Sequence, residues 1–186
     1  MNAAAEEIWA ILREVAQSQK ETDLKMKETD RKMQETDLKI KEMTASIGRL
    51  GNKLGDFVEE MVRPAAVRLF REQGIDVHEV HRGVSAKRNG EGIEVDLLVV
   101  NDNDVVAIEC KSTLSIDDIN EHVRRLEKLK RLLPTYKDKR AMGAVTGMVI
   151  PDNVAAYAYK QGFYVIAQSG DHLLMRNGEN FSPRVW

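Results

Sequence analysis

The chain has 186 residues, of which 42% are hydrophobic and 31% are charged, and its formal net charge at pH 7 is −2. This length accommodates one domain of ordinary size and an additional segment. A net charge so close to zero neither favours nor excludes an anionic partner. The single cysteine, Cys110, excludes an intrachain disulfide and is compatible with a reducing compartment.

The N-terminal residues mix apolar and charged side chains. Glu6, Glu7, Arg13 and Glu14 interrupt the apolar positions, which excludes the continuous apolar core of a signal peptide. No run approaches the roughly 18 apolar residues of a membrane-spanning helix. We therefore expect a cytoplasmic protein with no membrane partner.

Residues 21–41 contain three tandem copies of a seven-residue unit, ETDLKMK, ETDRKMQ and ETDLKIK. Apolar residues at positions a and d of such a repeat are typical of a coiled coil. The a row is Leu12, Gln19, Met26, Met33, Ile40, Ile47 and Leu54. The d row is Ile8, Val15, Thr22, Thr29, Thr36, Met43, Leu50 and Phe57. We expect residues 1–50 to form a coiled-coil helix that joins copies of the chain into a homo-oligomer.

Charged residues flank these two rows. The g positions hold Lys25, Lys32 and Lys39, and the e positions hold Asp23, Asp30 and Asp37. The alternative to a coiled coil is a single solvated helix, because i,i+4 pairs such as Glu21–Lys25 contribute about 0.2–0.5 kcal/mol each without a partner. Three threonines at d also make a poor interface. We favour self-association because so long an apolar stripe is costly to leave in water.

The coiled-coil helix should end between residues 48 and 55, because Gly48, Gly51 and Gly55 weaken a helix. Residues 51–186 would then form the second domain. A helical pattern opens that domain. Its apolar side is expected to contain Phe57, Met61, Ala65, Leu69 and Phe70, with Pro64 as a kink or the start of a second helix.

Strands and helices alternate through the rest of the domain. The pattern predicts a strand at 75–82, a polar loop at 83–92, strands at 93–100 and 104–112 joined by an Asn-Asp-Asn-Asp turn, a helix at 117–133, a strand at 141–150, a helix at 152–162 and strands at 163–168 and 172–177. In helix 117–133, Ser115 or Asp117 should cap the start. Its inward residues should be Ile119, Val123, Leu126 and Leu133. This order predicts an α/β fold with a mixed central sheet flanked by helices.

Two strands that should be buried carry charged side chains. Strand alternation places Glu94, Asp96 and Leu98 on one face, and Ala107, Glu109 and Lys111 on one face. The hairpin can therefore bring Asp96 and Glu109 side by side, with Lys111 next to them. Neighbouring desolvated carboxylates repel each other, and a divalent cation removes that cost. Oxygen ligands with open positions suit Mg²⁺ or Mn²⁺. The alternative is a structural ion-pair network at the strand ends.

This order of Asp, hairpin, Glu-x-Lys and helix resembles the PD-(D/E)XK nuclease superfamily, which has the restriction-endonuclease-like fold. The motif reads Val95-Asp96 and Glu109-Cys110-Lys111, with valine in place of the first motif's proline. Gly55-Asp56-Phe57-Val58-Glu59 is similar to the Gly-x-x-x-Glu helix of archaeal Holliday-junction resolvases. The resemblance covers roughly Leu54 to Gln168. The chain also resembles uncharacterised bacterial proteins that join a heptad rod to such a domain.

The resemblance implies metal-dependent hydrolysis of phosphodiester bonds in nucleic acid, and we expect the nucleic acid to be DNA. It implies catalytic roles for Asp96, Glu109, Lys111 and Glu59, with Glu60 as a weaker alternative to Glu59. The implied metal ligands are Asp96, Glu109, Glu59 and the backbone carbonyl of Cys110. Lys111 would orient the attacking water. The rival interpretation is a nuclease-fold binding or scaffolding protein without catalysis.

Basic residues cluster after the Glu-x-Lys motif. Arg124, Lys128 and Arg131 lie along one side of the predicted helix, and Lys87 and Arg88 lie in the predicted loop before the Asp96 strand. We expect these five side chains to contact nucleic acid. A solvated helix face is the alternative, because it is the commonest role of such a charge run.

Overall fold

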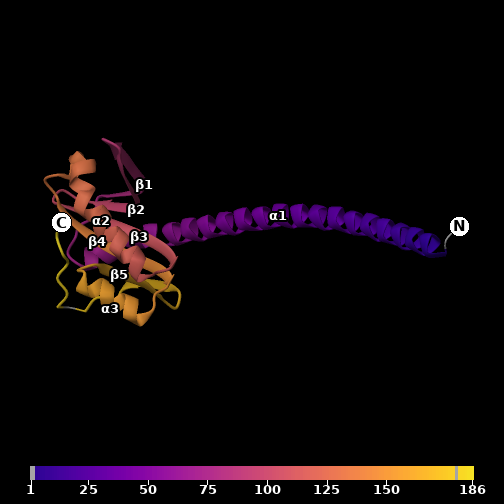
Figure 1. Ribbon diagram of the computed structural model, residues 1–186. Coiled ribbons are helices and arrows are strands. Elements are labelled where there is room, and N and C mark those ends of the chain that lie inside the picture. The colour runs from indigo at the N-terminus through magenta and orange to yellow at the C-terminus, as the bar shows by residue number, and fades with distance from the viewer. Residues whose placement is uncertain (1–2, 179) are drawn as a thin grey trace. The chain divides into compact units, whose positions relative to one another are not determined.

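The computed structural model describes residues 3–178 and 180–186. Its elements are α1 (Ala3–Glu72), β1 (Glu79–Arg88), β2 (Glu91–Val100), β3 (Asp104–Thr113), α2 (Ile116–Leu132), the short 3₁₀ helix η1 (Pro134–Tyr136), β4 (Arg140–Val149), α3 (Asp152–Lys160), β5 (Tyr164–Ser169) and β6 (His172–Met175) (Figure 1). The chain divides into two units, Met1–Leu50 and Gly51–Trp186. None of the helices in the described ranges is both long enough and apolar enough to cross a membrane.

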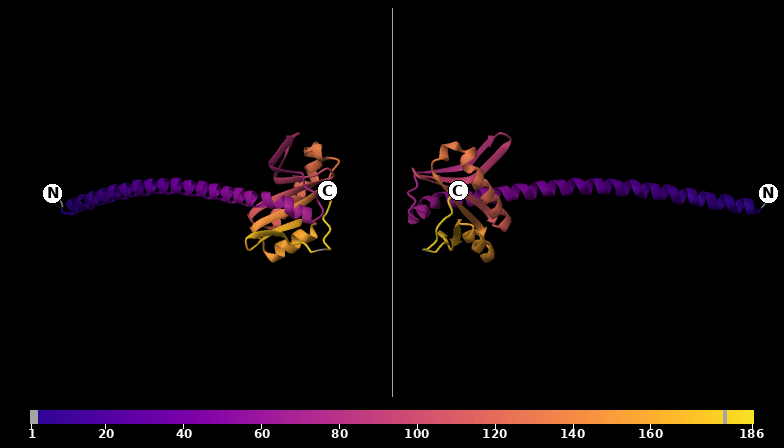
Figure 2. Two further views of the ribbon diagram at one scale, coloured as in Figure 1. Left: turned by 180° about the vertical axis from the view of Figure 1, so that it is seen from behind. Right: turned by 60° about the vertical axis from the view of Figure 1, so that its left-hand side comes forward.

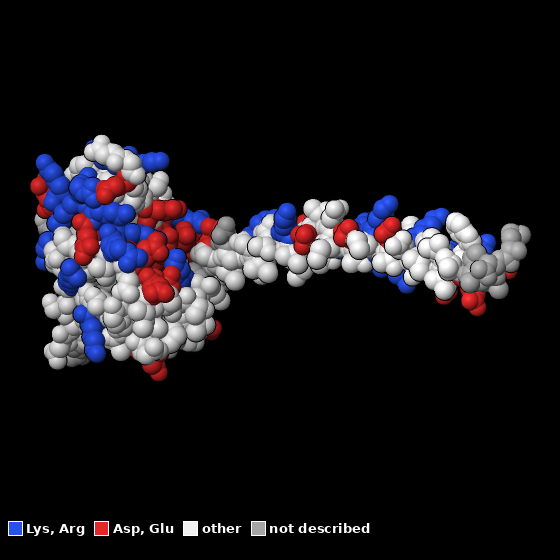
Figure 3. All heavy atoms as spheres, in the orientation of Figure 1, with Lys and Arg blue, Asp and Glu red and all other residues white. Residues whose placement is uncertain are grey.

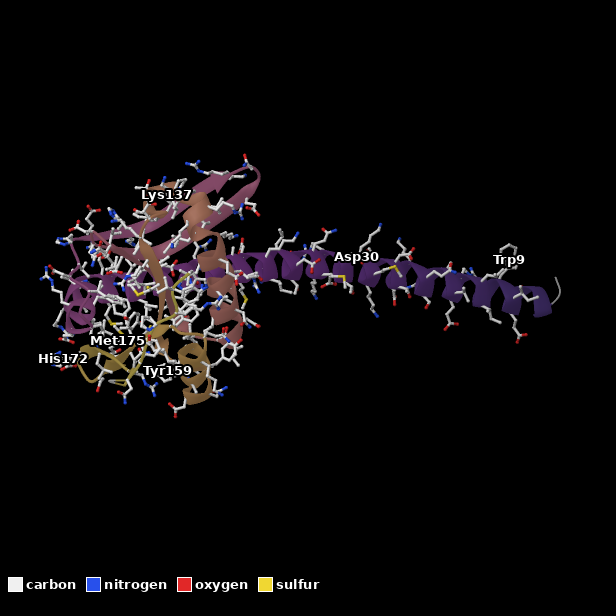
Figure 4. The ribbon with its side chains drawn as sticks, turned by 90° about the vertical axis from the view of Figure 1, so that its left-hand side faces the viewer. Trp9, Asp30, Lys137, Tyr159, His172 and Met175 are labelled. Carbon is white, nitrogen blue, oxygen red and sulfur yellow. The ribbon has the colours of Figure 1, made fainter. Side chains whose placement is uncertain are left out.

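The first unit is helical, as predicted, from Ala3 onward. The apolar side chains of its a and d rows are exposed, from 49% for Val15 to 67% for Ile47. Figure 4 shows side chains such as Trp9 and Asp30 extending from α1. Self-association of this segment stays a prediction.

The expectation that the helix ends at the glycines is wrong. Helix α1 passes through Gly48, Gly51 and Gly55 without interruption. Each glycine costs about 1 kcal/mol relative to alanine in a helix interior, but a helix continues when its next turns are held by packing. Val58 and Val62, which follow the glycines, are completely buried.

Pro64 likewise lies inside α1 and starts no second helix. A proline in a helix deprives the carbonyl four residues earlier, here that of Glu60, of its N–H partner. Both Pro64 and Glu60 are exposed, so water can hydrate that carbonyl. The cost of the proline is therefore smaller than at a buried position.

The second unit contains a six-stranded sheet in the order β1-β2-β3-β4-β5-β6. The pairs β1/β2, β2/β3 and β5/β6 are antiparallel, and β3/β4 and β4/β5 are parallel. Helix α2 connects β3 to β4, and α3 connects β4 to β5. The predicted mixed sheet flanked by helices is confirmed, and Figure 2 shows it from two further directions.

Two hydrophobic cores cover the two faces of this sheet. On the face that we call the α1 face, Val58, Val62, Ala66, Leu69 and Phe70 of α1 pack on strand residues that include Leu97 and Ile108. On the opposite α2 face, residues of α2 and α3 pack on strand residues that include Leu98 and Val145. Of the predicted inward residues of α1, Leu69 and Phe70 are completely buried, and Met61 and Ala65 are partly buried against the core of the α1 face. The prediction is wrong for Phe57, which is 55% exposed.

Of the two predicted caps of helix α2, Ser115 and Asp117, the N-cap is Ser115, whose hydroxyl accepts from the backbone N–H of Asp118 at 3.2 Å. Its buried residues are Ile119, His122, Leu126, Leu129 and Leu132. Val123 and Leu133, which were also predicted to point inward, are partly buried and pack against the core of the α2 face. His122 lies on the buried side of α2, which the sequence pattern did not predict.

The predicted polar loop at 83–92 is wrong, because most of it is strand. β1 continues to Arg88, and β2 begins at Glu91. Asn89 and Gly90 form the turn, with φ angles of 51° and 82°. Two consecutive positive φ angles are characteristic of the tight turn that suits the twist of a hairpin, and Asn-Gly is its preferred sequence.

The alternation of side chains breaks within β2. Val95 packs on the α2 face and Leu97 on the α1 face, although strict alternation would give these two residues the same face. The pairing of β1 with β2 omits the Gly83–Asp96 pair, and Gly83 has a φ of 60°. At Gly83 in β1 and Asp96 in β2, both strands therefore switch which alternate side chains lie on each face of the sheet.

Candidate active site

Asp96 lies where β2 separates from β3. The register of these strands runs from Val100↔Val105 to Leu97↔Ile108 and goes no further. At the adjacent residue of β2, Asp96 Oδ2 accepts a hydrogen bond from the backbone N–H of Cys110 at 2.7 Å. The carboxylate thus takes the place of a strand carbonyl.

The environment of Asp96 disfavours its charge. Burial raises the pKa of its carboxyl, and the nearby charge of Glu109 raises it further. The hydrogen bond from Cys110 and the charges of Lys111 and Arg125 oppose this shift without cancelling it. A cation beside Asp96 would favour the ionised form.

Glu109 is 1% exposed and is surrounded by basic groups. Its Oε1 lies 2.8 Å from Lys111 Nζ, and its Oε2 pairs with Arg125 of α2. His122 Nδ1 is 3.9 Å from the same Oε2. A buried carboxylate needs such partners, because an unpaired buried charge costs several kcal/mol.

Lys111 links the buried carboxylate of Glu109 to the protein surface. Its Nζ also lies 3.9 Å from Asp118 Oδ1 at the start of α2. Burial lowers the pKa of Lys111, but the hydrogen bond with Glu109 and the charges of Glu109, Asp96 and Asp118 outweigh it, so that the pKa is raised. Lys111 is therefore a cation at neutral pH.

Asp96 and Lys111 line an open cleft of about 530 Å³. Its lining residues are Gly51, Gly55, Asp56, Glu59, Glu94, Asp96, Cys110, Lys111 and Ser112. The lining contains four carboxylates and one ammonium group, and the cleft is acidic. The structure thus brings Glu59, Asp96 and Lys111 to one cleft, whereas Glu109 lies beneath α2 and reaches the cleft through Lys111.

Glu59 enters the cleft from α1 and is held by Arg82 of β1. Arg82 Nε lies 2.6 Å from Glu59 Oε2, and the same guanidinium contacts Asp56 at 2.7 Å and Glu60 at 2.8 Å. Arg82 was not singled out in the sequence. Its neighbour Gly83 marks the change of phase in β1 that brings the strand alongside these α1 residues.

The donor chemistry fits a hard divalent cation, since the cleft offers carboxylate oxygens. Over residues 3–178 and 180–186, however, no three His, Cys, Asp or Glu side chains are grouped so that they could hold a metal ion. Glu109 and Glu59 are instead paired with Arg125 and Arg82. The assignment of metal ligands, including the Cys110 carbonyl, stays a prediction.

A second open cleft of about 550 Å³ lies beside the first, and Glu94 lines both. It contains Arg124, Arg125 and Lys128 of α2, together with Ser85 and Glu121. Figure 3 shows Lys and Arg gathered on the side of the domain that carries α2. Two of the predicted nucleic-acid contacts, Arg124 and Lys128, therefore lie next to the acidic cleft.

The other predicted contacts lie elsewhere. Arg131 pairs with Glu91 at the base of the β1–β2 turn, which reduces its capacity to bind phosphate. Lys87 and Arg88 are exposed near the tip of the hairpin and are not among the residues that line the two clefts. Their contact with nucleic acid stays a prediction.

Arg125 was missed by the sequence analysis. It is 18% exposed and contacts Glu121 Oε1 at 2.7 Å in addition to Glu109. Its pairing with Glu109 spans 16 residues, and no local spacing in the sequence indicates it. Cys110 is buried, and burial strongly raises the pKa of its thiol, as expected for a core cysteine.

No family model and no curated protein matches the sequence. Similar solved structures include a repair endonuclease from Pyrococcus abyssi, with 17% identity and a TM-score of 0.38 over 56% of this chain and 44% of that chain. A protein of unknown function has 16% identity and a TM-score of 0.40 over 59% and 58% of the two chains. EndoMS in complex with double-stranded DNA has 15% identity and a TM-score of 0.34 over 58% and 44%.

This chain thus spans about half the length of those structures. Since the TM-scores are 0.40 or lower, the fold assignment rests on the strand order and register of the chain itself. The fold and the site define a mixed α/β domain with a lysine and several carboxylates where two central strands separate.

Proposed function

We propose that residues 51–186 hydrolyse phosphodiester bonds of nucleic acid, with DNA as the preferred substrate and Mg²⁺ or Mn²⁺ as the cofactor, and that residues 1–50 join copies of the chain. The observation that carries the proposal is the position of Lys111. Its ammonium is bonded to buried Glu109 at 2.8 Å and lines the same cleft as Asp96.

The charge of the cleft supports a cation-dependent reaction. Four carboxylates and one ammonium line it, so that a phosphodiester would be repelled from the cleft on its own. Asp96 and Glu59 would hold the divalent cation, and Glu109 would be a third ligand in place of its present pairing with Arg125. When bound, the cation neutralises the carboxylates and activates water.

Lys111 has the chemistry to act on the water and the phosphate. It is cationic at neutral pH, and Glu109 fixes the position of its ammonium. Its remaining N–H bonds would orient the attacking water and donate to a phosphate oxygen as negative charge develops there. Loss of one such donor typically costs about 10²–10³ in rate.

A second candidate function is binding without catalysis. The pairing of Glu109 with both Lys111 and Arg125 favours it, because these cations already neutralise the buried carboxylate. In that case the clefts would bind nucleic acid or a protein, and the helical segment would provide the assembly.

The two functions are separated by incubating the purified protein with supercoiled, linear, single-stranded and branched DNA and with RNA, with and without Mg²⁺ or Mn²⁺. We expect cleavage in the wild type with metal and at least a hundredfold loss in Lys111→Ala. Calorimetric titration with Mn²⁺ should still show binding to Lys111→Ala but none to Asp96→Ala. Equal residual activity in the wild type and Lys111→Ala would indicate a contaminating nuclease and leave the binding function.

A further inference from the structure

Residues 8–50 of α1 present a stripe formed by their a and d rows, which is apolar except for Gln19 and three threonines at d. Its large side chains include Leu12, Met26, Ile40 and Ile47, which are 51–67% exposed. The stripe is about 60 Å long at 1.5 Å per residue. Water contact along such a length is unfavourable for apolar side chains, and the surface therefore requires an occupant.

The threonines of the d row do not weaken this stripe as much as their polarity suggests. The hydroxyls of Thr22, Thr29 and Thr36 donate to the carbonyls four residues earlier, at 2.8–2.9 Å. Each hydroxyl is therefore satisfied within its own helix, and burial of the side chain leaves no unpaired donor. The methyl groups remain available for packing between helices.

The charges beside the stripe are sorted by side. All three g positions of the repeat are lysine, namely Lys25, Lys32 and Lys39, and all three e positions are aspartate, namely Asp23, Asp30 and Asp37. In a parallel pair a g residue faces the e residue five positions later in the other helix. In an antiparallel pair g faces g and e faces e, which here would oppose lysine to lysine and aspartate to aspartate.

We propose that residues 8–50 pair with the same residues of a second copy of the chain, in parallel orientation and in register. Lys25 and Lys32 of each copy then face Asp30 and Asp37 of the other. The intrahelical pair Arg31–Glu35 joins an f to a c position. In the pair Glu28–Lys32 the g residue Lys32 contacts Glu28 at c, so that neither pair covers the stripe. The orientation rests on the self-association proposed above, and the experiments below test the two separately.

Self-association is tested by light scattering on the full-length chain. The variant Met33→Asp/Ile40→Asp places carboxylates in the a row and should be monomeric at concentrations where the wild type is associated. The control is Leu24→Asp/Leu38→Asp. These leucines are equally exposed, at 60% and 61%, but occupy f positions, and this variant should remain associated. A monomeric wild type at tens of micromolar, or equal dissociation of both variants, overturns the proposed interface.

Orientation is tested by oxidative cross-linking of single-cysteine additions. Leu12→Cys and Ile47→Cys lie near opposite ends of the stripe, and each should form a covalent dimer with itself only if the helices are parallel and in register. Wild type controls for Cys110, which is 4% exposed, and Leu24→Cys controls for random collision. Cross-linking only in a mixture of Leu12→Cys and Ile47→Cys would establish an antiparallel pair. Association without any of these cross-links would overturn the register while leaving self-association intact.

Discussion

The backbone N–H of Cys110 on β3 donates to Asp96 Oδ2 on β2 at 2.7 Å. This bond holds a partly buried carboxyl whose pKa is raised by burial and by the charge of Glu109. An acid that is harder to ionise in the folded state than in the unfolded state contributes stability at low pH, and loses it as pH rises through its folded pKa. Ionisation of Asp96 therefore weakens the fold.

Asp96→Asn should consequently be more stable than the wild type at pH 7.5 without divalent cations, and this advantage should shrink as pH falls towards the ordinary pKa of aspartate. The amide oxygen of asparagine can still accept from Cys110. Urea unfolding followed by tryptophan fluorescence measures both points. Addition of Mg²⁺ should stabilise the wild type but not the variant, since binding to the native state adds to stability. A less stable variant at pH 7.5 would contradict this account of Asp96.

The sequence pattern was sufficient to predict the hairpin at 93–100 and 104–112. Two apolar runs flank a turn sequence, and β2 and β3 follow those limits closely. The cap of α2 was predicted to be Ser115 or Asp117, and it is Ser115, which forms a capping box with Asp118. These elements are set by residues close together in sequence.

The phase change at Asp96 was not readable in the same way. It depends on the positive φ of Gly83 on the neighbouring strand, and a glycine in a strand does not reveal its φ. The pairing of Arg125 with Glu109 spans 16 residues and needs α2 to pack over β3. Such contacts depend on tertiary arrangement, for which the periodicity of a single element carries no signal.

Gly83→Ala should destabilise the domain by about 1–2 kcal/mol, the cost of a left-handed conformation for a residue with a Cβ. Within the described part of the chain no atom lies within 4 Å of the added Cβ, so the cost comes from the backbone alone. The control is Gly92→Ala in β2, whose Cβ would meet its nearest atom at an ordinary 3.8 Å. Urea unfolding should separate the two variants. Gly83→Ala should also weaken Mn²⁺ binding at the proposed site, because relaxation of β1 would displace Asp96.

His122 predicts acid sensitivity of the fold. Burial lowers its pKa to about 4, with the positive charges of Arg125 and Lys111 acting in the same direction, against the hydrogen bond to the Ala107 carbonyl. Since the folded pKa lies below the unfolded value, the contribution of neutral His122 is complete above pH 6.5 and is lost as pH falls towards 4. The full effect is about 3 kcal/mol.

The measurement is the difference in unfolding free energy between wild type and His122→Phe at pH 7.5 and pH 4.5. Phenylalanine loses the hydrogen bond to Ala107 but can keep the stacking on Phe163, whose centroid lies 5.3 Å from that of His122. We expect the variant to be less stable at pH 7.5 and to lose less stability on acidification. A pH dependence identical to that of the wild type would show that another group controls acid unfolding.

Arg124 and Lys128 should supply phosphate contacts in the second cleft, which they line together. Each phosphate neutralised on duplex DNA contributes about −0.9 to the slope of log affinity against log salt concentration. Arg124→Ala/Lys128→Ala should therefore weaken binding of a duplex and make its slope shallower by roughly 1.8. The control is Lys160→Ala, which removes an exposed lysine of α3 outside both clefts and should leave the slope unchanged.

Arg131→Ala should change the slope less than the double variant, because Arg131 is already paired with Glu91. Fluorescence anisotropy of a labelled duplex across a salt series gives all four slopes, and equal slopes for wild type and the Arg124→Ala/Lys128→Ala variant would mean that nucleic acid does not follow this cleft.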